Sequence, residues 1–290
     1  MCCIGSVLWD VIGRRDGDMV AYEDRPGRIT RLPGGVALNV AMALQGHGLQ
    51  PILLSAVGLD VEGRALTEAC SEKGLVCDHL IRPDTLPTDH YMAIEVKNEV
   101  LAAIADAHTL EAVGSDILTP LRDGTLGSAA APWTGLVALD GNLTVGLLSE
   151  IAHDPCFAEA DLRVAPASPG KAQRLLPLLE HPGVTFYVNL TEARLILDAA
   201  PATAPEAAKA LHAAGATRAV VTDGARRAAF ADHSGVISAQ PPAVTVTQVT
   251  GAGDCFMAAH IAADLRGQSP AAALDAAIAA AASHVSGGSL

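Results

Sequence analysis

The residues best suited to chemistry form one short stretch, TGAGD at 250–254, which precedes an alanine-rich segment. The small residues Gly251, Ala252 and Gly253 let backbone N–H groups approach an anion closely, and a helix N-terminus favours negative charge. Asp254 would repel an anion that only binds there. It suits a phosphoryl group in transfer, because a carboxylate can accept the proton of the attacking hydroxyl. An ordinary capped helix start is the alternative, since Thr, Gly and Asp commonly precede a helix.

A second candidate site lies near the start of the chain, where Gly34 and Gly35 precede a helix-prone segment that carries Asn39. Paired glycines allow the backbone to approach a ligand, and the Asn39 amide offers both donors and an acceptor to hydroxyl groups. Asp10 closes the first apolar stretch, at the position where open parallel sheets bind ligands. A tight turn before a helix and a loop-capping Asp are the alternatives for these residues.

The elements that must position these side chains alternate along most of the chain, which predicts βαβ units and a mostly parallel sheet. Apolar stretches predict buried strands at 3–10, 51–57, 77–81, 137–139, 162–164, 185–188 and 219–222. Between and after them, composition predicts helices at 37–46, 61–73, 145–153, 169–180, 191–199, 205–214, 252–266 and 270–285.

Two segments, 11–32 and 89–106, break this alternation because their strands have one polar face. Together they predict a small sheet that projects from the main domain and covers a site or pairs with a second subunit. Long surface hairpins without a role are the alternative.

Composition limits the partners. The chain has 290 residues, half of them apolar, and a net charge of −13, which argues against nucleic acid or an anionic membrane surface as partner. Six cysteines without paired or metal-type spacing predict reduced thiols in a cytoplasmic protein. No apolar run is long enough to span a bilayer.

Five motifs in order resemble the ribokinase-like (PfkB-type) family of carbohydrate and nucleoside kinases over nearly the full chain. They are Asp10, GGVALN at 34–39, NLTE at 189–192, VTDG at 221–224 and TGAGD at 250–254. The resemblance implies one α/β domain over residues 1–290: a doubly wound, mostly parallel sheet with helices on both faces, plus a small β-sheet lid.

The resemblance also implies a role for each motif in transfer of the γ-phosphoryl group from ATP. Asp254 would be the catalytic base. The amides of Gly251, Ala252 and Gly253 would form the anion hole. Four residues would bind the sugar: Asp10, Gly34, Gly35 and Asn39. Asn189 and Glu192 would organise Mg²⁺ and phosphate, and Thr222, Gly224 and Thr250 would lie beside the nucleotide.

Within the family, the chain looks most like the pseudouridine kinases, which phosphorylate the 5′-hydroxyl of this ribonucleoside. RPGRI at 25–29 and Val249-Thr250 before GAGD carry this finer likeness. The partners it implies are a small nucleoside or sugar and a second copy of the chain, bound through the β lid. Another acceptor, such as ribose, a different nucleoside or a keto-sugar acid, is the first alternative. A catalytically weak nucleoside-binding protein is the second.

Three residues depart from the family pattern: Ala165 replaces an Asp, Gln248 replaces Asp or Asn, and Arg227 replaces a Gly. Gln248 weakens the expectation of a monovalent-cation site, and Arg227 would alter the nucleotide loop or add a cation near the phosphates. Tyr91 and Asp106 are the candidates for contacts that select the base.

Overall fold

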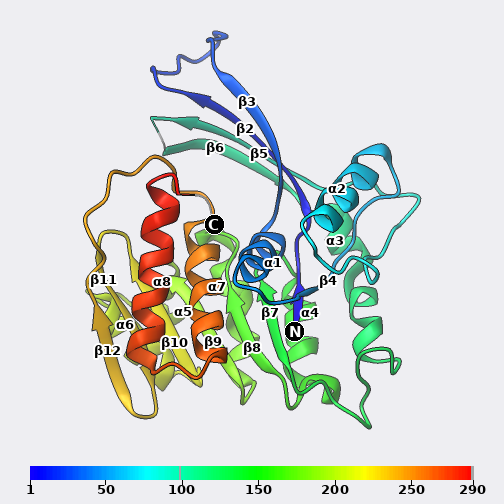
Figure 1. The fold of residues 1–290 in the computed structure, drawn as a ribbon, viewed down its shortest axis with the longest axis vertical. Coiled ribbons are helices and arrows are strands. Elements are labelled where there is room, and N and C mark those ends of the chain that lie inside the picture. The colour runs from blue at the N-terminus through cyan, green and yellow to red at the C-terminus, as the bar shows by residue number, and fades with distance from the viewer. Residues whose placement is uncertain (98, 289–290) are drawn as a thin grey trace.

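The structure is a computed structural model that describes residues 1–97 and 99–288 and arranges them around two β-sheets (Figure 1). The main sheet has eight strands, and a small sheet of four strands projects from one end of it. Helices cover both faces of the main sheet. The predicted fold class, doubly wound α/β with an additional small sheet, is confirmed.

The main sheet is parallel except at one edge. From β4 to β10 neighbouring strands are parallel, so that Cys3 lies between Leu53 and Ala138, whereas β11 and β12 pair in antiparallel fashion. In spatial order the strands are β12 (Gly235–Ala239), β11 (Arg226–Asp232), β10 (Arg218–Asp223), β9 (Val184–Asn189), β8 (Asp161–Ala165), β7 (Leu136–Asp140), β1 (Cys2–Ile4) and β4 (Ile52–Leu54). The chain order reverses between β1 and β7, and open parallel sheets bind ligands at the carboxyl ends of the strands beside such a reversal.

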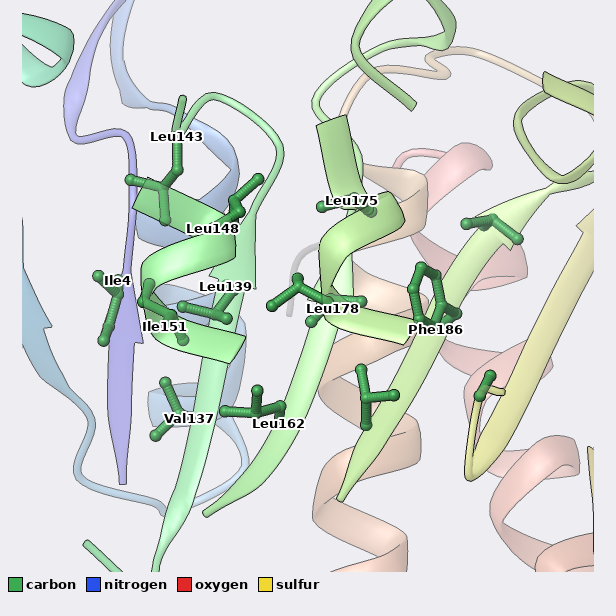
Figure 2. Close-up of a cluster of buried hydrophobic side chains, with 14 of the residues drawn as sticks. Ile4, Val137, Leu139, Leu143, Leu148, Ile151, Leu162, Leu175, Leu178 and Phe186 are labelled. Atoms are coloured by element: carbon green, nitrogen blue, oxygen red, sulfur yellow. The ribbon is translucent and has the colours of Figure 1, made fainter. Parts of the chain in front are cut away.

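The two faces of the main sheet bury separate hydrophobic clusters. One face packs against α1 (Val36–Gly46), α2 (Val61–Glu72), α7 (Ala252–Leu265) and α8 (Pro270–Val285). The other face packs against α3 (His108–Val113), α4 (Val145–His153), α5 (Leu190–Leu197), α6 (Ala204–Ala213) and the 3₁₀ segments η1 (Gly114–Leu121), η2 (Pro155–Phe157) and η3 (Pro169–Glu180). Figure 2 shows part of this second cluster, where strand residues Val137, Leu139 and Leu162 face Leu148, Ile151 and Leu178.

The small sheet has the order β3-β2-β5-β6, formed by β3 (Arg28–Gly34), β2 (Leu8–Arg15), β5 (His90–Val96) and β6 (Glu99–Asp106). Strands β2 and β5 are parallel, and the two outer pairs are antiparallel. The segments 11–32 and 89–106 therefore pair with each other, as the sequence predicts.

Two of the predicted strands are wrong. Residues 3–10 do not form one strand, because the chain leaves the main sheet at Gly5, whose φ is +147°. A Cβ there would lie 2.5 Å from the Asp140 carboxyl carbon. Asp10 consequently belongs to β2 of the small sheet, not to the carboxyl end of β1. Residues 77–81 form no strand either, since only the isolated bridge at Ile81 falls within them.

The strands β11 and β12 were not predicted, and the segment at 169–180 is a run of 3₁₀ turns with Pro177 inside it. Within residues 1–97 and 99–288, no helix combines the length and the apolar character needed to cross a membrane.

Candidate active site

A cavity of about 600 Å³ lies at the carboxyl ends of the central strands, beneath the small sheet. The small sheet contributes Leu8, Asp10, Tyr91, Ala103 and Ala105 to its wall. The main domain contributes the starts of α1 and α7, the ends of β9 and β10, and the chain that follows β8. The cavity therefore opens at the strand reversal and is covered by a separate sheet.

Asp254 lies in the first turn of α7 and lines this cavity. Gly251 is the N-cap of α7, with a φ of +83° that favours glycine. Asn39, in α1, donates a hydrogen bond from Nδ2 to Asp254 Oδ2 at 2.9 Å. The two motifs, far apart in sequence, thus meet side by side in one cavity.

The predicted anion hole, or phosphate cradle, consists of Gly251, Ala252 and Gly253, and these three residues differ in their surroundings. Gly251 and Gly253 line the cavity, and a Cβ at Gly253 would meet nothing within 4 Å. Ala252 does not line it, and its amide donates to the Val249 carbonyl at 3.2 Å. Of the three residues, the glycines are therefore those open to an anion.

Three carboxylates in the cavity wall hold protons unusually well. Burial raises the pKa of Asp254 to about 7, and the nearby carboxylates of Asp140, Asp10 and Glu192 add to this while the Asn39 hydrogen bond opposes it. Burial also raises the pKa of Asp10 to about 6 and that of Glu192 to about 7. A carboxylate with such a pKa can accept a proton near neutral pH.

The glycine pair shapes the site by allowing close approach. A Cβ at Gly34 would collide with the Asp10 carboxylate, and a Cβ at Gly35 would lie 2.5 Å from the Ser6 carbonyl oxygen. Gly35 lines the cavity and has a φ of +97°, whereas Gly34 does not line it. Gly34 therefore makes room for Asp10 instead of facing a ligand.

Asn189 and Glu192 form a capping box at the start of α5. Asn189 Oδ1 accepts from the Glu192 amide at 2.9 Å, and Glu192 Oε2 accepts from the Asn189 amide at 2.8 Å. Both residues line the cavity, although Glu192 is 8% exposed. Within residues 1–97 and 99–288, no group of three or more His, Cys, Asp or Glu residues could hold a metal ion. The second Glu192 oxygen fits Mg²⁺ that arrives with a phosphate substrate, because such Mg²⁺ needs one or two protein carboxylates.

Of the three residues predicted to lie beside the nucleotide, two line the cavity and one does not. Thr222, at the end of β10, lines the cavity, whereas Gly224 lies in the following turn and does not. Thr250 lines the cavity as well, but its hydroxyl donates to Glu95 Oε1 at 3.1 Å. Asp106 lies outside the wall and bonds to His108, while Tyr91 is part of it.

The structure shows where the three residues that depart from the family pattern lie and what they contact. Ala165 lines the cavity. The Arg227 guanidinium donates to the Ser238 hydroxyl and carbonyl, so it fastens β11 to β12 and does not line the cavity. The Gln248 side-chain amide donates to the His284 carbonyl at 3.1 Å and ties the loop before α7 to the end of α8.

Lys171 and Asn142 line the cavity but were not among the predicted site residues. Lys171 Nζ donates to Asn142 Oδ1 at 2.6 Å, and burial lowers the pKa of this lysine. The sequence signal was present: each residue follows the end of a predicted parallel strand, β7 or β8, and these ends share one edge of the sheet.

Comparison with known proteins places this chain among kinases. The profile of the pfkB family carbohydrate kinases matches residues 1–289. The pseudouridine kinase of Escherichia coli (strain K12) is 29% identical over 260 residues, which make up 88% of this chain and 80% of that protein.

Two solved structures share the fold. The adenosine kinase from Schistosoma mansoni, in complex with 2-fluoroadenosine, superposes with a TM-score of 0.81 at 17% identity over 100% of this chain and 96% of that one. Arabidopsis thaliana ribokinase, complexed with ribose and ATP, superposes with a TM-score of 0.74 at 20% identity over 98% and 91% of the two chains.

Proposed function

The chain belongs to the pfkB family of carbohydrate kinases, and we propose that it phosphorylates the 5′-hydroxyl of a ribonucleoside, most readily pseudouridine. Membership makes it a phosphotransferase with an alcohol acceptor that uses ATP. The observation that carries the proposal is the hydrogen bond of 2.9 Å between Asn39 and Asp254, beside Gly251 and Gly253 in the cavity wall. The name of the Escherichia coli relative supports pseudouridine as the acceptor.

The reaction requires a proton acceptor and an anion site close together. As the acceptor hydroxyl oxygen forms its bond to the γ-phosphorus, Asp254 takes the hydroxyl proton and the bond to the leaving ADP oxygen breaks. The amides at Gly251 and Gly253 would stabilise the charge on the transferring group. Asp10 and Asn39, which line the same cavity, would hold the sugar hydroxyls.

Two groups would complete the phosphate side of the cavity. Mg²⁺, when bound with ATP, would neutralise phosphate charge, and Glu192 with Asn189 would hold it. Lys171 presents an ammonium group to the same cavity and would attract phosphate oxygens. Because the three acidic groups Asp10, Glu192 and Asp254 have raised pKa values, added positive charge would favour their ionised forms.

We further propose that two copies of the chain associate through the small sheet. The face of this sheet opposite the cavity exposes four large apolar side chains: Ile29, Met92, Ile94 and Ile104. An exposed apolar sheet face of this kind marks an interaction surface.

The test is a coupled assay of ADP release with Mg²⁺ and ATP over pseudouridine, uridine, adenosine, ribose and a keto-sugar acid. We expect pseudouridine to give the largest kcat/KM, with the 5′-monophosphate identified by phosphorus NMR. Asp254→Asn should fold and lose about 10²–10⁴-fold in kcat, because a positioned base contributes that much.

A larger kcat/KM for another acceptor would reject pseudouridine and keep the kinase reaction. Ligand binding without turnover of any acceptor, or near-wild-type turnover by Asp254→Asn, would reject the proposed reaction itself.

A further inference from the structure

Glu95 is a buried carboxylate that the proposed reaction does not use. It lies on β5 of the small sheet, its side chain is 9% exposed, and it does not line the cavity. A buried carboxylate is unfavourable unless it is paired and hydrogen-bonded. Glu95 satisfies this condition with two partners, because Oε2 accepts from Arg14 Nε at 2.6 Å and Oε1 accepts from Thr250 Oγ1 at 3.1 Å.

The two partners belong to different parts of the molecule. Arg14 lies on β2, directly beside Glu95 in the strand register, so this ion pair is internal to the small sheet. Thr250 is distant in sequence and lies in the loop that leads into α7, immediately before Gly251. The second hydrogen bond therefore joins the small sheet to the phosphate cradle.

The local geometry of the small sheet favours this contact. The register of β5 and β6 shifts at Glu95, since Ile94 pairs with Ala102 and Glu95 pairs with Val100, which leaves Leu101 as an extra residue. A β-bulge bends and twists the strands and redirects side chains beside functional sites. The extra residue lies on β6, and the partner strand β5 presents Glu95 to Thr250 at this bulge.

Thr250 is also held from the main domain. Its carbonyl oxygen lies 2.8 Å from His284 Nε2 of α8, while His284 Nδ1 lies 3.3 Å from the Cys255 sulfur. Gly251 follows Thr250 and is the N-cap of α7, in the left-handed conformation. The backbone of Thr250 is thus fixed by α8, and its side chain by the small sheet.

We propose that Glu95 is a positioning residue that couples the small sheet to the phosphate cradle. While the sheet covers the cavity, Glu95 holds Thr250 in place. It thereby also orders the backbone that leads into the amides of Gly251–Gly253. When the sheet moves away, this restraint is lost and the cradle is less ordered. Phosphoryl transfer is then favoured only when the acceptor is covered and water is excluded. This inference rests on the proposed kinase function.

A double-mutant cycle tests the coupling. We expect Glu95→Ala and Thr250→Val each to lower kcat by roughly tenfold with a smaller change in the acceptor KM, because a hydrogen bond to a buried charge is lost. In both variants, the rate of ATP hydrolysis measured without acceptor should rise relative to the rate of phosphoryl transfer to the acceptor. The double variant should be no worse than either single variant, since both changes remove the same contact.

Two further variants separate this role from general stability. Glu95→Gln keeps an oxygen that can accept from Thr250, and it should retain more activity than Glu95→Ala. Lys97→Gln is the matched control, because it removes the exposed ion pair of Lys97 with Asp18, in the loops that follow β5 and β2, and should leave kcat unchanged.

Hydrogen exchange of the substrate-free protein provides a readout that needs no turnover. Amides at 249–253 should exchange faster in Glu95→Ala than in the wild type or Lys97→Gln. Unchanged exchange, or additive losses of kcat in the double variant, would overturn the coupling. If the wild type phosphorylates no acceptor, the proposed function fails, and the exchange experiment still decides whether Glu95 orders the loop.

Discussion

Asp254 combines two properties that oppose each other in most carboxylates. It is close enough to Asn39 to accept a hydrogen bond, which lowers its pKa, yet burial and neighbouring carboxylates raise that pKa to about 7. A base with a pKa near the working pH is ionised often enough to act and still takes protons readily. The surroundings of Asp254 therefore suit it to accept a proton at neutral pH.

This balance predicts a pH dependence with a defined sign. The base must be ionised, so kcat/KM should rise with pH through about 7 and then level off. Asn39→Ala removes the hydrogen bond that favours the ionised form, and it should shift the rising limb to higher pH. Initial rates at saturating Mg²⁺, in buffers of constant ionic strength, measure both profiles. A limb that stays at the same pH in Asn39→Ala would contradict the assignment of this pKa to Asp254.

The same pKa links Asp254 to stability. Its folded pKa of about 7 exceeds the ordinary value of 3.8, so the folded state binds more protons than the unfolded state between these limits. The contribution of Asp254 to stability is thus present below pH 4 and is lost as pH rises to 7. Asp254→Asn should unfold at a higher temperature than the wild type at pH 8, with a smaller difference at pH 4.

At the scale of elements, caps explain which boundaries could be predicted. Helices at 145–153 and 270–285 have the predicted bounds, because Thr144 and Ser269 are N-caps whose side chains accept backbone hydrogen bonds. The break at Gly5 could not be predicted, since it depends on the distant residue Asp140. Apolar pattern alone also could not distinguish the bridge at Ile81 from a strand.

Asp140 connects three elements of this region through hydrogen bonds. It lies at the end of β7, is fully buried, and its Oδ2 accepts from Ser6 N at 2.7 Å, from Ser6 Oγ at 2.6 Å and from Ala37 N at 3.1 Å. Its Oδ1 accepts from Asn142 N at 2.6 Å. One carboxylate therefore joins the end of β1, the start of α1 and the loop after β7, and so positions Asn39.

We predict that Asp140→Asn destabilises the fold by about 2–4 kcal/mol, because an amide NH₂ would replace an oxygen that buried donors require. Urea unfolding measures this change. Asp123→Asn is the matched control, since Asp123 is exposed and accepts from the Thr125 amide in a loop. Equal unfolding midpoints for Asp140→Asn and the wild type would show that the hydrogen bonds to Asp140 do not stabilise this region.

At the scale of the whole molecule, the site combines residues from distant parts of the chain. The sequence predicted Asp254, Asn39 and Asp10 as neighbours through motif order, and the structure brings all three to one cavity. The sequence could not predict the Glu95–Thr250 contact, because this contact depends on how two sheets are placed relative to each other. Spacing within a motif carries no information about such placement.

The proposed dimer is the prediction that belongs to this largest scale. Ile29, Met92, Ile94 and Ile104 are 79%, 53%, 39% and 70% exposed on the outer face of the small sheet. Burying this face against a second copy would remove apolar area from water without closing the cavity, which lies on the opposite face. Light scattering after size exclusion should give a dimer for the wild type and a monomer for Ile104→Glu. Val145→Glu, at an exposed position on α4, should remain dimeric. A monomeric wild type at micromolar concentration would rule out a stable interface on this sheet.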